Sequence, residues 1–405
     1  SVSAFLLNRS SDLSFKELAQ HRKANISNVT YDLTFNIPAD AKTPVTGKAV
    51  IAFDLKEKDD VVLDFQGGFS GTCTVNNKKK RQATYKHEHI VLAAKLLKQG
   101  LNIVEIDFAS TNKALNRQKE FMYTIFLPDQ ASTAFPCFNQ PDIRARFTTT
   151  LNIPEGWKAM FSDGKNPIPV YLYSFVAGKF EEKAAVRDGY PIRALYRETD
   201  PKKVAQLDAI FGEITKSMKW MESYTGIKCP FKEYGLAIIP DYPFGGMEHP
   251  GAFQINESRL LLDSNASKEE ELKRMELIAH ETAHLWFGNV VQLNWTENLW
   301  EKEVIANIMA SKITRKQVDA KESDINFLST YQNKAIALDR TDGTYDIDQP
   351  SIVDHTTLLY DNIIYNKATV MMRSLEQLVG ATKMQNGLRS FLQKYYFKEA
   401  SWEDL

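Results

Sequence analysis

The stretch ELIAHETAHLWFGN, residues 276–289, carries the most specific signal in the sequence. It places His280 and His284 four residues apart with Glu281 between them, on a run that is typical of a helix. Residues four apart on a helix project from adjacent turns, with about 5–6 Å between Cβ atoms, so two imidazoles can bind one metal ion. The chain has only 7 histidines, so a chance H-E-x-x-H is expected in roughly one such chain in a hundred. The alternative is one exposed histidine and one core histidine.

The spacing suits hydrolysis assisted by zinc. Catalytic zinc typically takes three protein ligands and keeps a fourth position for water. Glu281 is turned away from the ligand axis, so it can accept a proton from that water as the water attacks a carbonyl. A third ligand must come from another segment. Glu297, Glu301 and Glu303 all lie on the next predicted helix, and the spacing within that helix does not choose among them.

The first half of the chain alternates apolar and polar residues. The alternation runs through residues 29–37, 49–55 and 147–153, with turn-rich segments between. A period of two predicts antiparallel strands with one solvated face. We therefore expect residues 1–199 to form an all-β domain, built as a β-sandwich.

A helical pattern begins at Asp200, followed by Pro201, and lasts until Gly226. Ser267 and Glu270 form a capping-box sequence ahead of the histidine-bearing helix. Further helices are predicted from Thr296 to Met309 and from Asp361 to Leu378. Residues 200–405 are therefore expected to be a mostly helical domain with a small sheet, which makes the chain an α+β multidomain protein.

Composition narrows the function. The net charge is −1, so nothing favours nucleic acid or an acidic membrane surface as a partner. No apolar run approaches the ~18 residues of a membrane-spanning helix. The 3 cysteines exclude a disulfide framework and a cysteine-based zinc knuckle. The compartment stays open: a leader removed before Ser1 implies the cell envelope or periplasm, and otherwise the cytoplasm is expected. The sequence ASWEDL, which ends at Leu405, begins another helix cap, so we expect the native polypeptide to continue.

The sequence HETAH, followed by eighteen residues and then Glu303, resembles the glutamate-zincin aminopeptidases, the family of aminopeptidase N and leukotriene hydrolase. The resemblance covers residues from about 20 onward, including FPCFNQPDIRARF in the predicted β domain. It implies a thermolysin-like catalytic domain, one zinc ion and Glu303 as the third ligand. It also implies peptides with a free N-terminus as substrates. We expect a monomer.

The segment GGMEH, Gly245 to His249, resembles the G-x-M-E-N exopeptidase motif of that family. Gly245, Gly246 and Met247 would pair with a peptide backbone as an added strand. Glu248 would hold the protonated α-amine of the substrate, and His249 stands where the family usually has Asn. The alternative is a glycine-rich turn with an exposed glutamate.

The segment YNKATVMMRSLEQL begins at Tyr365, where the resemblance implies a tyrosine that donates to the oxyanion. Without the resemblance, Tyr365 would be interpreted as a core aromatic. Tyr360 and Phe244 would line the pocket for the first side chain. A pair of histidines in KHEH, His87 and His89, is a weaker metal candidate, since both are expected on one face of a strand with no third ligand nearby.

Two other functions use the same residues. A thermolysin-like endopeptidase or epoxide hydrolase would share the metal centre, but the Glu248 motif argues against an endopeptidase. A catalytically impaired relative could serve as a binding scaffold. Such proteins usually lose zinc ligands or the general base, whereas His280, Glu281, His284 and Glu303 are all present here.

Overall fold

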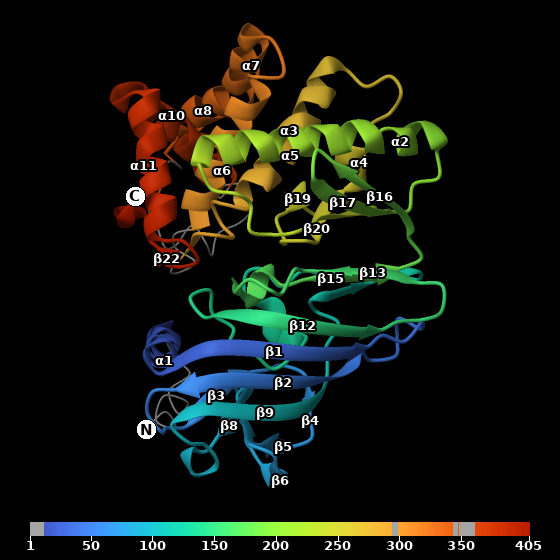
Figure 1. The fold of residues 1–405 in the computed structure, drawn as a ribbon, viewed down its shortest axis with the longest axis vertical. Helices are drawn as coiled ribbons and strands as arrows, with labels where there is room; N and C mark the ends of the chain where they lie inside the picture. The colour runs from blue at the N-terminus through green and yellow to red at the C-terminus, as the bar shows by residue number, and fades with distance from the viewer. Residues whose placement is uncertain (1–11, 294–298, 343–346, 348–360) are drawn as a thin grey trace. The chain divides into compact units, whose positions relative to one another are not determined.

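The computed structural model describes residues 12–293, 299–342, 347 and 361–405, and Figure 1 shows their arrangement. The chain forms two compact units that divide between Glu181 and Glu182. The change to a helical pattern at Asp200 lies further along the chain. The difference arises because strands β16 (Glu181–Arg187) and β17 (Tyr190–Tyr196) join the sheet of the second unit.

Among its described residues, the first unit begins with helix α1 (Asp12–Asn25), which the all-β prediction did not include, and continues as strands in three sheets. The largest sheet has the order β14-β12-β1-β2-β9-β5-β6, with β4 also paired to β9. Its strands are β1 (Ile26–Asn36), β2 (Thr46–Leu55), β4 (Gly68–Phe69), β5 (Thr72–Val75), β6 (Lys78–Gln82), β9 (Gly100–Ala109), β12 (Arg144–Asn152) and β14 (Ile168–Pro169). The four-stranded sheet contains β10 (Leu115–Arg117), β11 (Phe121–Thr124), β15 (Phe175–Gly178) and β13 (Lys158–Phe161), and the three-stranded sheet contains β3 (Val61–Asp64), β8 (His89–Leu92) and β7 (Thr84–Lys86).

The predicted alternation is confirmed in β1, where Val29, Tyr31, Leu33 and Phe35 are buried. The expectation that every pair would be antiparallel is wrong for β1 and β12, which run parallel. A parallel neighbour far along the chain leaves no signal in the alternation, because the period of two describes which face is buried and not which strand is adjacent.

Aromatic side chains join the large sheet to the four-stranded sheet. Phe35 on β1 lies 4.8 Å, between ring centroids, from Phe175 on β15. The ring of Phe147 on β12 stacks on Tyr31 at 5.1 Å and on Tyr173 at 4.5 Å. Large aromatic rings bury the most apolar area per residue, so this layer forms the centre of the first core.

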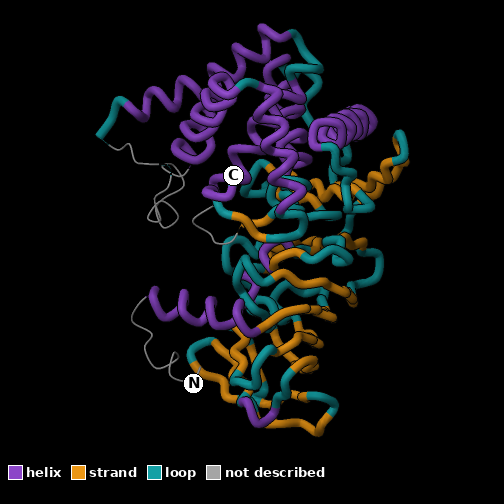
Figure 2. The backbone as a smooth tube through the Cα atoms, turned by 60° about the vertical axis from the view of Figure 1, so that its left-hand side comes forward, coloured by secondary structure: helices purple, strands orange, loops and turns teal. Residues whose placement is uncertain are grey.

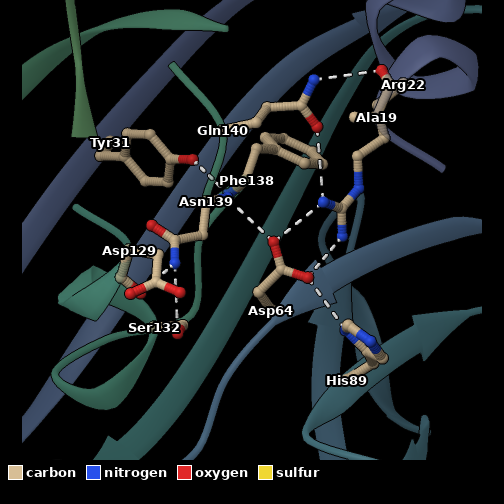
Figure 3. Close-up of polar contacts among 10 residues, drawn as sticks. All are labelled: Ala19, Arg22, Tyr31, Asp64, His89, Asp129, Ser132, Phe138, Asn139 and Gln140. Carbon is tan, nitrogen blue, oxygen red and sulfur yellow. Dashed lines mark hydrogen bonds and ion pairs between the residues drawn. The ribbon is translucent and has the colours of Figure 1, made fainter. Parts of the chain in front are cut away.

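A buried ion cluster fixes α1 to the strands of this unit (Figure 3). Arg22 of α1 donates two hydrogen bonds to Asp64, at 2.8 and 2.7 Å. Asn139 donates its backbone N–H to the same carboxylate at 2.9 Å. His89 Nδ1 lies 2.9 Å from Asp64 Oδ1. Burial by itself would raise the pKa of Asp64, but Arg22 and His89 hold it far below the ordinary range.

The histidine pair in KHEH is not arranged as predicted. His87 is exposed and has φ +51° in the turn between β7 and β8, whereas His89 is buried against Asp64. The two side chains therefore do not share a strand face.

Helices dominate the second unit, beside a small sheet (Figure 2). The sheet has the order β16-β17-β18-β20-β19, with β18 (Tyr234–Ile239), β20 (Phe253–Asn256) and β19 (Gly246–Met247). Two short strands, β21 (Gln292–Leu293) and β22 (Glu399–Ala400), pair separately. The helices of the described residues are α2 (Pro201–Ala205), α3 (Leu207–Thr225), α4 (Glu257–Leu260), α5 (Lys268–His284), α6 (Leu299–Thr314), α7 (Ala320–Phe327), η6 (Leu328–Gln332), α8 (Asn333–Asp339), η8 (Asp361–Lys367), α10 (Ala368–Val379), α11 (Ala381–Lys394) and η9 (Trp402–Asp404).

The helix ends confirm the local signals in the sequence. The Asp200 side chain accepts from the Lys202 N–H at the start of α2. Gly226 ends α3 at φ +73°, which glycine adopts without steric cost. Ser267 and Glu270 form both hydrogen bonds of the predicted capping box at the start of α5. The helix predicted from Thr296 begins at Leu299 in the described part of the chain.

The Asp64 cluster gives a stability prediction. We expect Asp64→Asn to lower the free energy of unfolding at pH 7 by about 3 kcal/mol, since the buried Arg22 loses the carboxylate that compensates its charge. The folded-state pKa of Asp64 is depressed, so the difference should be fully present above about pH 4 and should be lost as the pH falls further. Urea unfolding of both proteins from pH 7 to pH 3 measures it.

The matched control is Glu105→Gln in the large sheet of the same unit, because Glu105 pairs with the exposed Lys48. We expect that change to cost less than about 1 kcal/mol. An equal effect of the two substitutions would contradict a structural role for the buried cluster.

Candidate metal centre

Helices α5 and α6 bring the three predicted ligands together. The Nε2 atoms of His280 and His284 lie 2.9 Å apart. Oε2 of Glu303 lies 3.3 Å from His280 Nε2 and 3.4 Å from His284 Nε2. Two consecutive turns of α5 and the first turns of α6 therefore direct two nitrogens and one oxygen toward a common point.

The orientation of His284 is set by a backbone carbonyl. Its Nδ1 lies 3.0 Å from the oxygen of Phe287, which can only accept a hydrogen bond. Nδ1 therefore carries the proton, and Nε2 offers its lone pair to the centre of the cluster. A carbonyl behind the ligating imidazole is a typical outer contact of histidine in metal sites.

These residues fit zinc. Two imidazole nitrogens and a carboxylate oxygen are a common donor set for catalytic zinc, and ligand atoms around a tetrahedral zinc ion lie about 3.3 Å apart. His280, His284 and Glu303 would hold the ion. Among the described residues, a second group of possible ligands combines Glu248, Glu281 and His284. It shares His284 and is therefore part of the same centre.

Glu301, the other candidate ligand on α6 within the described residues, lies elsewhere. It is buried, and its pKa is raised to about 8 by burial and by the nearby Asp404 and Glu403. Glu297 falls outside the described residues. The tertiary arrangement thus agrees with Glu303, which the spacing of α6 by itself could not select.

Glu281 lies beside the ligands and is only 3% exposed. Its Oε2 meets no hydrogen-bond donor among the described residues. Burial, reinforced by Glu248 and Glu303 and opposed by His280, raises its pKa to about 8. A carboxylate with one oxygen that accepts no hydrogen bond and with a raised pKa has the properties of a general base.

Gly246 is in close contact with this carboxylate. A Cβ at position 246 would lie 2.3 Å from Oε1 of Glu281 and 2.8 Å from Ile255 Cδ1. Only a residue without a side chain allows β19 to lie this close to α5. The glycine in the predicted motif therefore has a packing reason, which the sequence could not show.

Strand β19 ends the sheet of the second unit. Met247 pairs with Gln254 of β20, and β20 is the one partner of β19 in the sheet order of the described residues. Edge strands offer unpaired backbone groups to an incoming chain. The outer edge of β19 is therefore suited to accept an extended peptide.

Glu248 follows this strand and is 3% exposed. It is therefore not the exposed turn glutamate of the alternative interpretation. Asn289 donates to its backbone oxygen at 2.9 Å. His249, where the resemblance implies Asn, is also buried.

Lys302 completes the cluster, and the sequence analysis missed it. Its ammonium makes a short ion pair with Oε1 of Glu248 and lies 3.4 Å from Oε1 of Glu303. Burial would raise the pKa of Glu248, but Lys302, with His284, holds it at about 2. The available signal was a lysine directly before Glu303 on a helix whose following residues are almost all apolar.

Tyr365 lies in η8, with its ring centroid 6.4 Å from that of His280. Asn307 of α6 donates to the Tyr365 backbone oxygen at 3.3 Å and to Thr369 Oγ1 at 3.0 Å, which ties η8 to the ligand helix. Phe244 is 44% exposed and packs edge-on against Tyr242. Tyr360 falls outside the described residues.

None of the helices in the described ranges is long and apolar enough to cross a bilayer.

Comparison with known proteins agrees with the geometry. The sequence model described as "Peptidase family M1 domain" matches residues 210–405. A leucyl aminopeptidase of Saccharolobus solfataricus is 27% identical, over 75% of this chain and 40% of the relative. A puromycin-sensitive aminopeptidase of Caenorhabditis elegans is 29% identical, over 74% and 34%. A glutamyl aminopeptidase of Homo sapiens is 27% identical, over 75% and 34%.

The chain thus spans less than half the length of these curated relatives. Within that span, the matched residues contain both ligand helices, the general-base candidate and the segment GGMEH. Residues 210–405 thus match the peptidase family M1 domain, and about three quarters of the chain is similar to aminopeptidases.

Proposed function

We propose that this protein is a zinc aminopeptidase that removes N-terminal residues from peptides one at a time. The observation that carries the proposal is a single buried cluster in the second unit. It combines the possible ligands His280, His284 and Glu303 with two further carboxylates. These are Glu281, one oxygen of which accepts no hydrogen bond from the described residues, and Glu248. The family and the names of the relatives support the same activity.

A bound zinc ion would supply Lewis acidity to the substrate carbonyl and acidity to a water molecule. Glu281 would take the proton of that water, because one of its oxygens has no donor among the described groups. Gly246 lets the substrate-binding strand pass directly beside this base. Tyr365 would donate its hydroxyl proton in a hydrogen bond to the oxyanion.

The substrate is held by two kinds of contact. The outer edge of β19 would pair with the peptide backbone, which fixes the direction of the chain. Glu248 would accept hydrogen bonds from the α-ammonium, and so would fix which peptide bond reaches Glu281. Phe244 and Tyr360 remain proposed contacts of the first side chain.

Product analysis tests the proposal. We expect an unblocked peptide to lose single residues from its N-terminus, without internal fragments, as followed by mass spectrometry. A metal chelator should stop the release, and added zinc should restore it. Internal fragments would favour an endopeptidase instead, and unchanged activity in chelator would contradict the metal centre.

Glu281→Gln should lower kcat by about 10²- to 10⁴-fold, because the amide cannot accept the proton of the water. Zinc content, measured by elemental analysis, should stay at the wild-type level since Glu281 is not among the proposed ligands. Glu271→Gln, on the exposed face of the same helix, is the matched control and should leave kcat unchanged. Full activity of Glu281→Gln would support the binding-scaffold alternative.

Gly246→Ala should lower kcat/KM by about tenfold or more. The added Cβ would overlap Glu281 Oε1 and Ile255 Cδ1, so the base or the strand must move, and small displacements of reacting groups are costly. Gly212→Ala on α3 is the control, because a Cβ there meets nothing within 4 Å. Steady-state kinetics on an aminoacyl amide measure both variants. Equal kinetics for Gly246→Ala and the wild type would show that this close approach is not needed.

A further inference from the structure

Lys302 is buried in the centre of the site, with 3% of its surface exposed. It lies on α6 directly before the proposed ligand Glu303, and its ammonium pairs with Glu248, 54 residues away in the sequence. Burying a lysine is costly unless its charge is compensated. The compensation here comes from Glu248 and, at 3.4 Å, from Glu303.

Lys302 presents to Glu248 a primary ammonium, which is the same chemical group that the N-terminus of a peptide substrate would present. A lysine side chain and a peptide N-terminus both present a primary ammonium with three N–H donors. Charge-assisted hydrogen bonds to a carboxylate are short and strong for either of them. One oxygen of Glu248 is therefore occupied by an internal ammonium before any peptide arrives.

We propose that Lys302 competes with the substrate α-ammonium for Glu248, and thereby limits how strongly this site prefers a free N-terminus. The inference rests on the proposed role of Glu248 and adds a specificity-determining residue to it.

The physical basis is the charge balance at Glu248. An incoming α-ammonium must either bind the second carboxylate oxygen beside the like charge of Lys302 or displace Lys302 toward Glu303. Like charges a few ångströms apart in a dry site repel. Displacement would break the ion pair that compensates a buried lysine. Both routes reduce the free energy gained when the amine binds.

Two probes that differ only in the α-ammonium and contain no amide bond to hydrolyse test this inference: L-leucinol and its des-amino analogue, 4-methylpentan-1-ol. Calorimetry on the full chain gives their dissociation constants. The amine preference is the dissociation constant of the des-amino probe divided by that of the amine probe. Removing the competing charge in Lys302→Gln should raise this ratio by about tenfold or more over the wild type. A hydrogen bond to a charged group changes a dissociation constant by about that factor.

Lys312→Gln is the matched control. Lys312 lies on the same helix and pairs with Glu376, away from the ligands. The amine preference of this variant should remain within about twofold of the wild type. Lys302→Arg keeps the positive charge and should also keep the low preference, which separates the effect of charge from a general loosening of the site.

An unchanged or lower ratio in Lys302→Gln would overturn the inference, as would a failure of that variant to bind either probe. If Lys302→Gln does not fold, Lys302→Met keeps the unbranched stem without the ammonium and carries the same expectation. The readout is binding and not turnover. Absence of zinc or of hydrolysis would therefore contradict the proposed function. The amine preference would still test the inference about Lys302, because it is measured from binding.

Discussion

The proposed catalytic site depends on one constraint, the compensation of charge in a buried space between α5, α6 and β19. Glu248, Glu281 and Glu303 are each at most 5% exposed. Carboxylates this close cannot all be ionised unless cations lie among them. Lys302 provides one cation, and the ligand set provides the place for another. The same constraint explains why the pKa values diverge, with that of Glu281 raised and those of Glu248 and Glu303 lowered.

Backbone placement is the second requirement. A strand two residues long, β19, lies at the edge of its sheet and against the helix that carries the base. The absence of a side chain at Gly246 makes this contact possible, so the edge proposed to bind peptide and Glu281 are adjacent. In the proposed site, one helix thus supplies two ligands and the base. One strand supplies the edge and leads directly to Glu248.

The first unit shows a motif whose role is structural. Phe135 and Phe138 of the segment FPCFNQPD are fully buried, and Cys137 bridges to Asp64 through the backbone. Gln140 donates to the backbone oxygen of Ala19 at 3.1 Å and accepts from Arg22 at 3.4 Å (Figure 3). This segment therefore belongs to the same buried network as Asp64, and its resemblance to the family pattern reflects packing in this unit.

What the sequence determined by itself was local. The alternation in β1, the capping box at Ser267, the stop at Gly226 and the spacing of His280 and His284 each depend on residues within a few positions of one another. The resemblance added Glu303, Glu248 and Tyr365, whose positions no local pattern could connect. Helix α1, the parallel partner of β1 and the division after Glu181 were missed, because each depends on pairing or packing with distant residues.

The tertiary structure alone decided how Lys302 meets Glu248 and how Gly246 meets Glu281. Both contacts join β19, or the residue that follows it, to a helix across a long stretch of chain. Spacing along a chain predicts contacts only within one element, where the repeat of the backbone sets which side chains are neighbours. Contacts between elements follow from how their buried faces fit, and that is settled only when the whole unit packs.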